Sequence, residues 1–415
     1  MRISTPTMNQ RGIDGMLDNQ TELSHVQKQM SSGKRVLTPA DDPVAATQML
    51  NLRKSLELTE QYQKNADYAR NRMNIEEQTL ESSGNVLQRV RELVVQANND
   101  SLDNFDREAI AKEVDERLKE LVGLANAKDG AGEYLFSGSR SRTTPFSYTE
   151  EAGFQYHGDN KTRKLQIGPD YEVQQTTSGE RLFMDVAEGN RTFSTDYNPE
   201  NAGSGVISEG RVASQTDLTR HAYTLDVVEA PNDDAESPLQ VRVFDKDRGE
   251  YVIGSEEPPE GQPYKPGMDI SFDGIALSLE GKPQPGDEFT IEPSRSQSVF
   301  DTIGGIVESL KANWDNPEKR AKAQMEMDNA LIEVTNAMDN ILNARAGIGA
   351  RINSVDSQSY VNDAYSLQME ETLSGIEDLD YASATGELNM KMVGLQAAQQ
   401  VYSKLKDMSL FNYVR

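Results

Sequence analysis

The chain contains no cysteine in its 415 residues. It therefore has no disulfide bond, no thiolate nucleophile and no cysteine-ligated metal. The stretch from Met1 to Met16 lacks the apolar core of a secretory signal, and no segment is apolar for long enough to span a bilayer. We therefore expect no membrane insertion, and we expect any export to use another route.

Basic residues are also scarce, with 42 Lys and Arg against 68 Asp and Glu and a formal net charge of −26. A surface that binds phosphates must be basic, so this balance argues against a nucleic-acid partner. Hydrophobic residues make up only 36% of the chain. That fraction is low for a compact globular core, but long and thin helical packing tolerates it. The length suggests two to four domains.

A heptad seam dominates the first part of the chain. Its fourteen positions alternate by three and four residues, ten of them are apolar, and they predict a long helix packed in a coiled-coil manner. The positions are Leu52, Ser55, Thr59, Tyr62, Ala66, Ala69, Met73, Glu76, Leu80, Ser83, Leu87, Val90, Val94 and Ala97. A second helix, capped by Asp103 or Asn104, follows.

The last third of the chain repeats this spacing. Asn316 and Pro317 mark a helix start, and the later apolar positions again step by three and four. They are Leu331, Val334, Met338, Ile341, Arg345, Ile348, Ile352 and Val355. Matching seams near both ends predict that the two regions pack together as an antiparallel bundle.

The middle of the chain has the period-two alternation of β-strands. Tyr223, Leu225 and Val227 alternate with polar residues, and Asp273–Gly274 forms a turn signal between two apolar runs. We expect one or two small antiparallel β units, divided by the Gly-rich and polar stretch 194–210.

Both ends of the chain carry amphipathic helical patterns outside polar joints. A short amphipathic helix is marginal in water without a partner, so we expect these stripes to form an assembly interface with the other terminus or with other copies. The interface residues are Ile13, Met16, Leu23, Val26, Met30, Leu388, Met392, Leu395, Ala398, Tyr402, Leu405, Leu410 and Phe411. The first joint contains Gly33, Pro39, Asp41, Asp42 and Pro43, and Asp42 with Pro43 restarts a helix.

The predicted fold class is therefore α+β, with a long antiparallel coiled-coil bundle and an inserted antiparallel β-rich outer domain. The predicted segments are a terminal helix and flexible joint (1–42), the first half of the coiled coil (43–138), the β-rich insertion (139–299), the second half of the coiled coil (300–377), and the second joint and terminal helix (378–415).

No residue pattern supports a catalytic, cofactor or metal site. His25, His157 and His221 fall in three different zones and lack metal-ligand spacing. Gly347 and Gly349 resemble a fragment of a dinucleotide loop, but they lie inside a heptad run, which favours close helix packing.

The stretch Asp245–Gly249 is similar to a calcium loop in its acidic spacing. The glycine that such a loop needs at its sixth position is Glu250 here, so we favour a hairpin turn after a strand.

Several motifs at both ends of the chain resemble the flagellin superfamily. They are MRIST (Met1–Thr5), MSSGKR (Met30–Arg35), PADDPVAA (Pro39–Ala46), GEYLFSGS (Gly132–Ser139) and IEDLDYA (Ile376–Ala382). The stretch TPADDPVAA stands where filament flagellin usually has SAKDDAAGLAI, and the ending SLFNYVR departs from the usual LSLLR. Within the superfamily the chain is most similar to the members that join the flagellar hook to the filament. The resemblance covers about 1–140 and 300–415.

The resemblance implies a structural subunit of the bacterial flagellum that assembles head to tail through its terminal helices. It implies contacts with other copies, with a neighbouring hook-associated protein on the hook side, and with flagellin on the filament side. It also implies an extracellular location, reached through the flagellar type III apparatus with a dedicated chaperone and no cleaved signal.

Two alternatives remain at this point. The chain is a filament flagellin, or it is a surface-exposed adhesive module whose β region binds a ligand on a coiled-coil stalk. An enzyme carried in the insertion has no residue support.

Overall fold

The computed structural model describes residues 5–99, 101–230, 239–256, 260–312 and 314–407. They group into two compact units. The first comprises residues 1–66, 166–171 and 356–415, and the second comprises residues 67–165 and 172–355.

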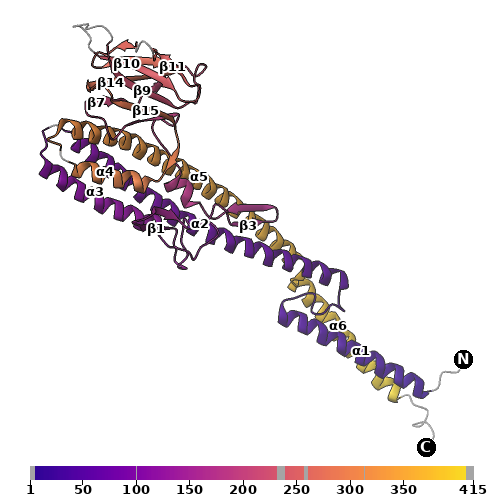
Figure 1. The fold of residues 1–415 in the computed structure, drawn as a ribbon. Helices are drawn as coiled ribbons and strands as arrows, with labels where there is room; N and C mark the ends of the chain where they lie inside the picture. Colours follow the sequence, from indigo (N-terminus) through magenta and orange to yellow (C-terminus); the bar gives the residue numbers. More distant parts are fainter. Residues whose placement is uncertain (1–4, 100, 231–238, 257–259, 313, 408–415) are drawn as a thin grey trace, which may run out of the picture. The chain divides into compact units, whose positions relative to one another are not determined.

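Helices make up both ends of the described chain (Figure 1). They are α1 (Thr5–Ser32), α2 (Pro43–Ala97), α3 (Asn104–Ala125), α4 (Val299–Lys311), α5 (Pro317–Glu377) and α6 (Tyr381–Asp407). Two predicted starts are confirmed, because α2 begins at Pro43 and α5 at Pro317. Asp103 caps α3 and accepts a hydrogen bond from the Asp106 amide at 2.8 Å.

The predicted seam on α2 is buried from its fifth position onward. Every seam position from Ala66 to Ala97 is buried, including Glu76 and Ser83. On α5, Val334, Ile341 and Ile348 are buried. The heptad pattern therefore identified the helical core.

The first group of short strands precedes the main β region. It contains β1 (Phe146–Thr149), β2 (Gly153–Tyr156), β3 (Lys164–Gly168), β4 (Tyr171–Gln174), the π-helical turn η1 (Glu180–Met184) and β5 (Val186–Ala187). Phe136, Phe146, Phe183 and Phe300 pack edge-to-face or stacked, with ring centroids 5.2–5.7 Å apart. This cluster joins the strand group to α4.

Two sheets then pack on one core, and we call residues 193–293 the β-sandwich. The six-stranded sheet has the order β11-β10-β9-β15-β6, with β12 paired to β10. Its strands are β6 (Phe193–Tyr197), β9 (Tyr223–Glu229), β10 (Leu239–Asp245), β11 (Glu250–Ile253), β12 (Gln262–Pro263) and β15 (Glu288–Pro293).

The second sheet has the order β13-β14-β7, with β8 paired to β14. Its strands are β7 (Ser204–Ile207), β8 (Arg211–Val212), β13 (Met268–Phe272) and β14 (Ile275–Lys282). Asp273 (φ 41°) and Gly274 (φ 78°) join β13 to β14, and positive φ at both central residues is the requirement of a type I′ hairpin turn.

The predicted division of the insertion at 194–210 is wrong. That stretch contains β6 and β7, and Phe193 and Ile207 are part of the common core of the sandwich. The sandwich instead begins at Phe193, after β5, and it ends before β16 (Ser296–Gln297), which pairs antiparallel with β5. Composition suggested a linker because short strands with small polar residues resemble loops.

Two smaller expectations also have clear outcomes. β10 and β11 pair as an antiparallel hairpin, so the turn interpretation of Asp245–Gly249 is confirmed. Gly347 and Gly349 lie inside α5, but a Cβ added at either would meet no atom within 4 Å. Close helix packing is therefore not the reason for these glycines.

Candidate assembly site at the chain ends

The two polar joints lie side by side in the first unit. The Arg35 amide donates to the Glu377 carbonyl at 2.7 Å, and the Leu379 amide donates to the Gly33 carbonyl at 2.9 Å. Gly33 has φ 72°, a conformation in which glycine avoids the penalty of a side chain. These backbone hydrogen bonds link the two joints directly. The sequence of either joint alone does not predict this pairing.

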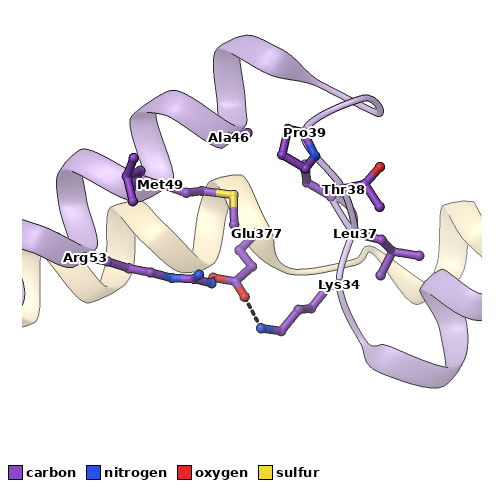
Figure 2. A pocket seen from close by; sticks show the side chains of 10 residues that line it. Lys34, Leu37, Thr38, Pro39, Ala46, Met49, Arg53 and Glu377 are labelled. Carbon is purple, nitrogen blue, oxygen red and sulfur yellow. Dashed lines mark hydrogen bonds and ion pairs between the residues drawn. The ribbon is translucent and has the colours of Figure 1, made fainter.

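Glu377, the last residue of α5, is the charged centre of this joint (Figure 2). Its carboxylate pairs with the Lys34 ammonium and accepts a hydrogen bond from Arg53 Nη2 at 2.7 Å. The Glu377 side chain is 9% exposed, whereas both partners are about half exposed. The hydrogen bond from Lys34 and that from Arg53 hold the pKa of the Glu377 carboxyl below its ordinary value.

Two aspartates shape the loop of the first joint. Asp41 Oδ2 accepts hydrogen bonds from the amides of Leu37 (3.0 Å) and Thr38 (2.8 Å). Asp42 Oδ1 accepts from the Ala45 amide at 3.0 Å and so caps α2 at the predicted residue. The backbone hydrogen bond from Thr38 lowers the pKa of Asp41, and that from Ala45 lowers the pKa of Asp42. The predicted flexible joint is therefore a folded, hydrogen-bonded turn in this structure.

A notch of about 340 Å³ opens beside the joint. Pro39 and Leu37 line one wall, and Ala46 and Met49 on α2 line the other (Figure 2). A small core lies beneath it, formed by Val36, Ala45 and Met49 with Leu373 and Ile376. The joint thus has its own apolar support.

Helices α1 and α6 pack along each other within the first unit. Lys391 forms an ion pair with Glu22, and the Tyr381 hydroxyl donates to the Met30 carbonyl at 3.1 Å. A methyl group at Gly12 would lie 3.3 Å from the Tyr402 ring. The two terminal helices are therefore each other's partner in the structure.

Most of the predicted interface residues lie on the shielded sides of α1 and α6. Val26 is buried at 3% exposure. The half-buried members are Ile13, Met16, Leu23, Met30, Leu388, Leu395, Ala398 and Tyr402. Met392 is 43% exposed, because Lys391 occupies the heptad position between Leu388 and Leu395. Leu405 lies in α6, but its side chain is outside the described residues, as are Leu410 and Phe411.

A second apolar stripe on α6 faces solvent. Met390 (70% exposed), Val393 (64%), Ala397 and Val401 (56%) follow each other at spacings of three, four and four residues. This stripe, here called the outer α6 stripe, did not appear among the predicted interface residues. The signal was present as helical spacing, but the pattern alone does not say which of two apolar faces meets α1.

Only His25 lies at the joint among the three histidines, with its Nε2 3.8 Å from Asp41 Oδ1. His221 Nδ1 lies 2.8 Å from Asp245 Oδ2, and these two residues with Asp247 bring potential ligand atoms within 4.8 Å of one another. Asp245 Oδ1 already accepts from the amides of Asp247 and Arg248, at 2.9 Å each. The cluster closes the β10–β11 turn with the hydrogen bonds of its own backbone. Among the described residues, no helix is both long and apolar enough to cross a bilayer.

Two known proteins with the same name match the chain along nearly its whole length. The Escherichia coli (strain K12) flagellar hook-associated protein 3 is 24% identical over 411 residues, which cover 99% of both chains. The protein of the same name from Salmonella typhimurium is 23% identical and covers all of both chains.

Solved structures give the same result. The crystal structure of flagellar hook associated protein-3 from Legionella pneumophila is 29% identical, with a TM-score of 0.74, and the match covers 78% of this chain and 98% of that one. The FlgL structure from Xanthomonas campestris is 27% identical, with a TM-score of 0.70, and the match covers 78% and 99%.

Two family models match the two ends. Residues 3–141 match the bacterial flagellin N-terminal helical region, and residues 331–414 match the bacterial flagellin C-terminal helical region. Together they cover more than half of the chain, and the seams, the joints and the paired terminal helices all lie within them or at their borders. The chain belongs to the flagellin family.

Proposed function

We propose that this protein is a structural subunit of the bacterial flagellum that forms the junction between hook and filament. The observation that carries the proposal is the full-length match to hook-associated protein 3 from two bacteria, which includes the β insertion. Length of match alone does not separate the two classes, because a flagellin from Clostridium tyrobutyricum matches 34% of the chain but flagellin B from Vibrio cholerae matches 96% of it at 22% identity. The structures of hook associated protein-3 from Legionella pneumophila and FlgL from Xanthomonas campestris, at 29% and 27% identity with TM-scores of 0.74 and 0.70, add support for the junction.

The partners follow from the place of a junction. We propose that the protein contacts its own copies, a hook-associated neighbour on one side and flagellin on the other. We also propose that it is exported through the flagellar type III channel with a chaperone, and that it acts outside the cell. The absence of cysteine suits passage into an oxidising space.

The terminal helices are the proposed assembly elements. In the structure, α1 covers the inner side of α6, so the outer α6 stripe is left for contacts with another copy. An exposed row of apolar side chains on a pair of helices is costly in water and is often an interaction surface. We infer that subunits pair α1 with α6 internally and use the outer stripe between copies.

Two variants of α6 separate these contacts. Val393→Asp changes the outer α6 stripe, whereas the double variant Leu395→Asp and Leu405→Asp changes the interface predicted from the helical spacing. Burying an unpaired carboxylate costs several kcal/mol, so we expect both variants to fail in assembly on hook ends. Only the double variant should also expose α1 and α6 of the monomer to protease.

The assay is electron microscopy of hooks from cells that carry each variant, together with the amount of flagellin released into the medium. Secretion of the variant must be verified first. Normal filaments with an exported Val393→Asp variant would exclude the outer α6 stripe as a contact between copies.

A deletion strain tests the function itself. Intact hooks with secreted flagellin monomers support a junction role over a filament flagellin. Retained swimming with lost adhesion would support the adhesive module instead.

A further inference from the structure

A row of polar residues on α5 holds the β-sandwich. Its members are spaced by four, three, four, three and four residues, so they lie on one face of the helix. They are Lys322, Glu326, Asn329, Glu333, Asn336 and Asn340, and we call this row the docking strip.

The N-terminal half of the docking strip binds β6 and the residues that follow it. Asn329 Nδ2 donates to the Thr195 carbonyl at 2.8 Å, the Tyr197 hydroxyl donates to Glu326 at 2.5 Å, and Lys322 donates to the Pro199 carbonyl at 2.8 Å. β6 is the edge strand of the six-stranded sheet. An edge strand exposes unpaired backbone groups. The docking strip binds carbonyl groups of this edge that water would otherwise hydrate.

The C-terminal half of the docking strip binds the two segments through which the chain enters and leaves the sandwich. There β5 pairs with β16, and we call this two-stranded ladder the neck. Asn336 Nδ2 donates to the carbonyls of Ala187 (2.7 Å) and Gly189 (2.9 Å), and Asn340 donates to the Asp185 carbonyl at 3.1 Å.

Glu333 stands at the centre of the docking strip. One of its oxygens accepts hydrogen bonds from Gln297 in β16 and from the Thr302 hydroxyl in α4, the latter at 3.0 Å. It thereby ties the exit strand of the neck to α5.

The charges that act on Glu333 from the neighbouring elements are negative. Burial is the main cause that raises its pKa to about 7, and the charges of Glu188 beside the neck and Asp196 on β6 act in the same direction, against the smaller lowering by the hydrogen bonds from Thr302 and Gln297. Two basic residues near the neck have other acidic partners: Arg191 pairs with Asp339 and donates from Nε to Asn336 Oδ1 at 2.8 Å, and Arg295 pairs with Glu292.

We propose that the docking strip is a pH-sensitive latch, in which ionisation of Glu333 loosens the contact between α5 and the neck and β6. At low pH the neutral carboxyl sits without repulsion beside Glu188 and Asp196. At higher pH the half-buried Glu333 carries a charge that Glu188 and Asp196 repel, and the released state, in which water hydrates Glu333 more fully, gains population.

The absence of cysteine allows a direct test on the full-length chain. A single reporter thiol is placed by Thr195→Cys on β6, where the Thr195 hydroxyl is buried without a hydrogen-bond partner. A second chain carries Val241→Cys in the centre of the sandwich, at 0% exposure. Protection is the labelling rate in denaturant divided by the rate in the folded chain at the same pH, which removes the pH dependence of the thiol itself.

Between pH 5.5 and pH 8.5, protection at residue 195 should fall by about tenfold or more. The Glu333 carboxyl has a higher pKa in the docked state than in the open state, so raising the pH shifts the equilibrium toward the open state. Protection at residue 241 should fall less. Glu333→Gln should remove the pH dependence at residue 195, whereas Glu371→Gln, an exposed carboxylate on the same helix, should preserve it.

Equal protection at both pH values overturns the latch, as does a Glu333→Gln chain that keeps the wild-type pH dependence. Parallel loss at residues 195 and 241 also overturns it, because that is unfolding of the whole sandwich. If Glu333→Gln does not fold, the double variant Glu188→Gln and Asp196→Asn takes its place. That variant should weaken the pH dependence, and an unchanged dependence contradicts the proposal.

Discussion

Arg53 near the start of α2 and Glu377 at the end of α5 are 324 residues apart in the chain, and they are joined by a hydrogen bond of 2.7 Å. Lys34 shares the same carboxylate. One side chain thus connects the first joint, the first turns of α2 and the second joint. The terminal helices leave the body of the first unit at this point.

Replacing Glu377 by Gln should loosen the joint without unfolding the chain. Because Lys34 and Arg53 are half exposed, the loss should be modest, about 1 kcal/mol. The measurement is the rate at which a protease cleaves within residues 33–42 at neutral pH. Glu371→Gln, on the exposed side of α5, is the control and should leave this rate unchanged.

The same carboxylate predicts a pH dependence of the joint. Its pKa is lowered in the folded chain, mainly by the hydrogen bond from Lys34, so its contribution is complete above the unfolded value of 4.5 and is lost as the pH falls through the folded value. Pepsin should therefore cut the wild-type joint faster as the pH drops below about 4, relative to an unfolded substrate. If the Glu377→Gln chain shows the same increase in pepsin cleavage at low pH, the increase comes from another titratable group.

Two neighbouring glutamates on α2 should respond to substitution in opposite directions. Glu76 is fully buried in the seam, and neither of its oxygens makes a hydrogen bond of good geometry among the described residues. Burial raises the pKa of its carboxyl and outweighs the opposite effects of Thr177, Arg351 and Arg72. Glu77 pairs with Arg345 at 2.6 Å near the surface. We expect Glu76→Gln to raise the free energy of unfolding by roughly 1–3 kcal/mol and Glu77→Gln to lower it by less than about 1 kcal/mol.

Urea unfolding of both variants checks this prediction. Since a raised pKa makes the folded state lose stability as the pH increases through that pKa, the advantage of Glu76→Gln should be larger at pH 8 than at pH 5. A destabilised Glu76→Gln chain at both pH values would mean that the carboxyl has a partner that the Gln amide does not replace.

The helical part of the fold could be predicted because its signals are local. A cap such as Asp42 before Pro43 sets a helix start, and the heptad spacing from Ala66 to Ala97 sets the buried face without knowledge of the partner. The spacing could not show that Met392 faces away from α1, because α6 has two apolar faces and only the tertiary pairing with α1 makes Lys391 part of the inner one.

The docking strip was invisible for a related reason. Asn329 and Asn336 are polar residues on a helix, and such residues usually indicate a solvent-exposed face. In the structure their side-chain amides donate to carbonyl groups of β6 and the neck. Because every residue has a backbone carbonyl, the sequence of the partner segment does not reveal such hydrogen bonds. The joint contact of Glu377 with Arg53 likewise requires two segments that only the fold brings together.

Gly138, in the GEYLFSGS motif, is expected to be intolerant of any side chain. It has φ 66°, and a Cβ there would lie 1.9 Å from the Asp159 carbonyl oxygen. The Asp159 carboxylate also binds the Ser139 amide at 2.7 Å, so the two turns cannot easily separate. Gly138→Ala should therefore cost about 3 kcal/mol or more in thermal or urea unfolding.

Gly132 is the matched control for this position. It also has a positive φ, of 79°, but its Cβ would meet no atom within 4 Å. Gly132→Ala should therefore cost only the backbone penalty, about 1–2 kcal/mol. Equal losses at the two positions would show that contact with Asp159 is not what requires the glycine at 138.

The neck allows the β-sandwich to be removed while the helical part stays intact. Ala187 pairs with Ser296, and the Glu188 amide donates to the Arg295 carbonyl at 2.9 Å, so the two connections are already adjacent. Replacing residues 188–295 by Asn-Gly should close the neck as a two-residue hairpin. The buried core of the sandwich comes from residues 193–291 except for Met325 of α5, so a Met325→Lys substitution should keep the shortened chain soluble.

We expect the shortened chain to keep its far-UV helical signal and a cooperative melting transition, because the buried seams of α2 and α5 lie outside the excised residues. A wider deletion that joins Ser139 to Val299 also removes Phe146 and Phe183, which pack on Phe300, and it should melt at a lower temperature. Circular dichroism of the two chains at one pH gives the comparison. Loss of the helical signal in the Asn-Gly chain would show that the bundle depends on the sandwich, and a wider deletion as stable as the shortened chain would show that the aromatic cluster does not stabilise the helices.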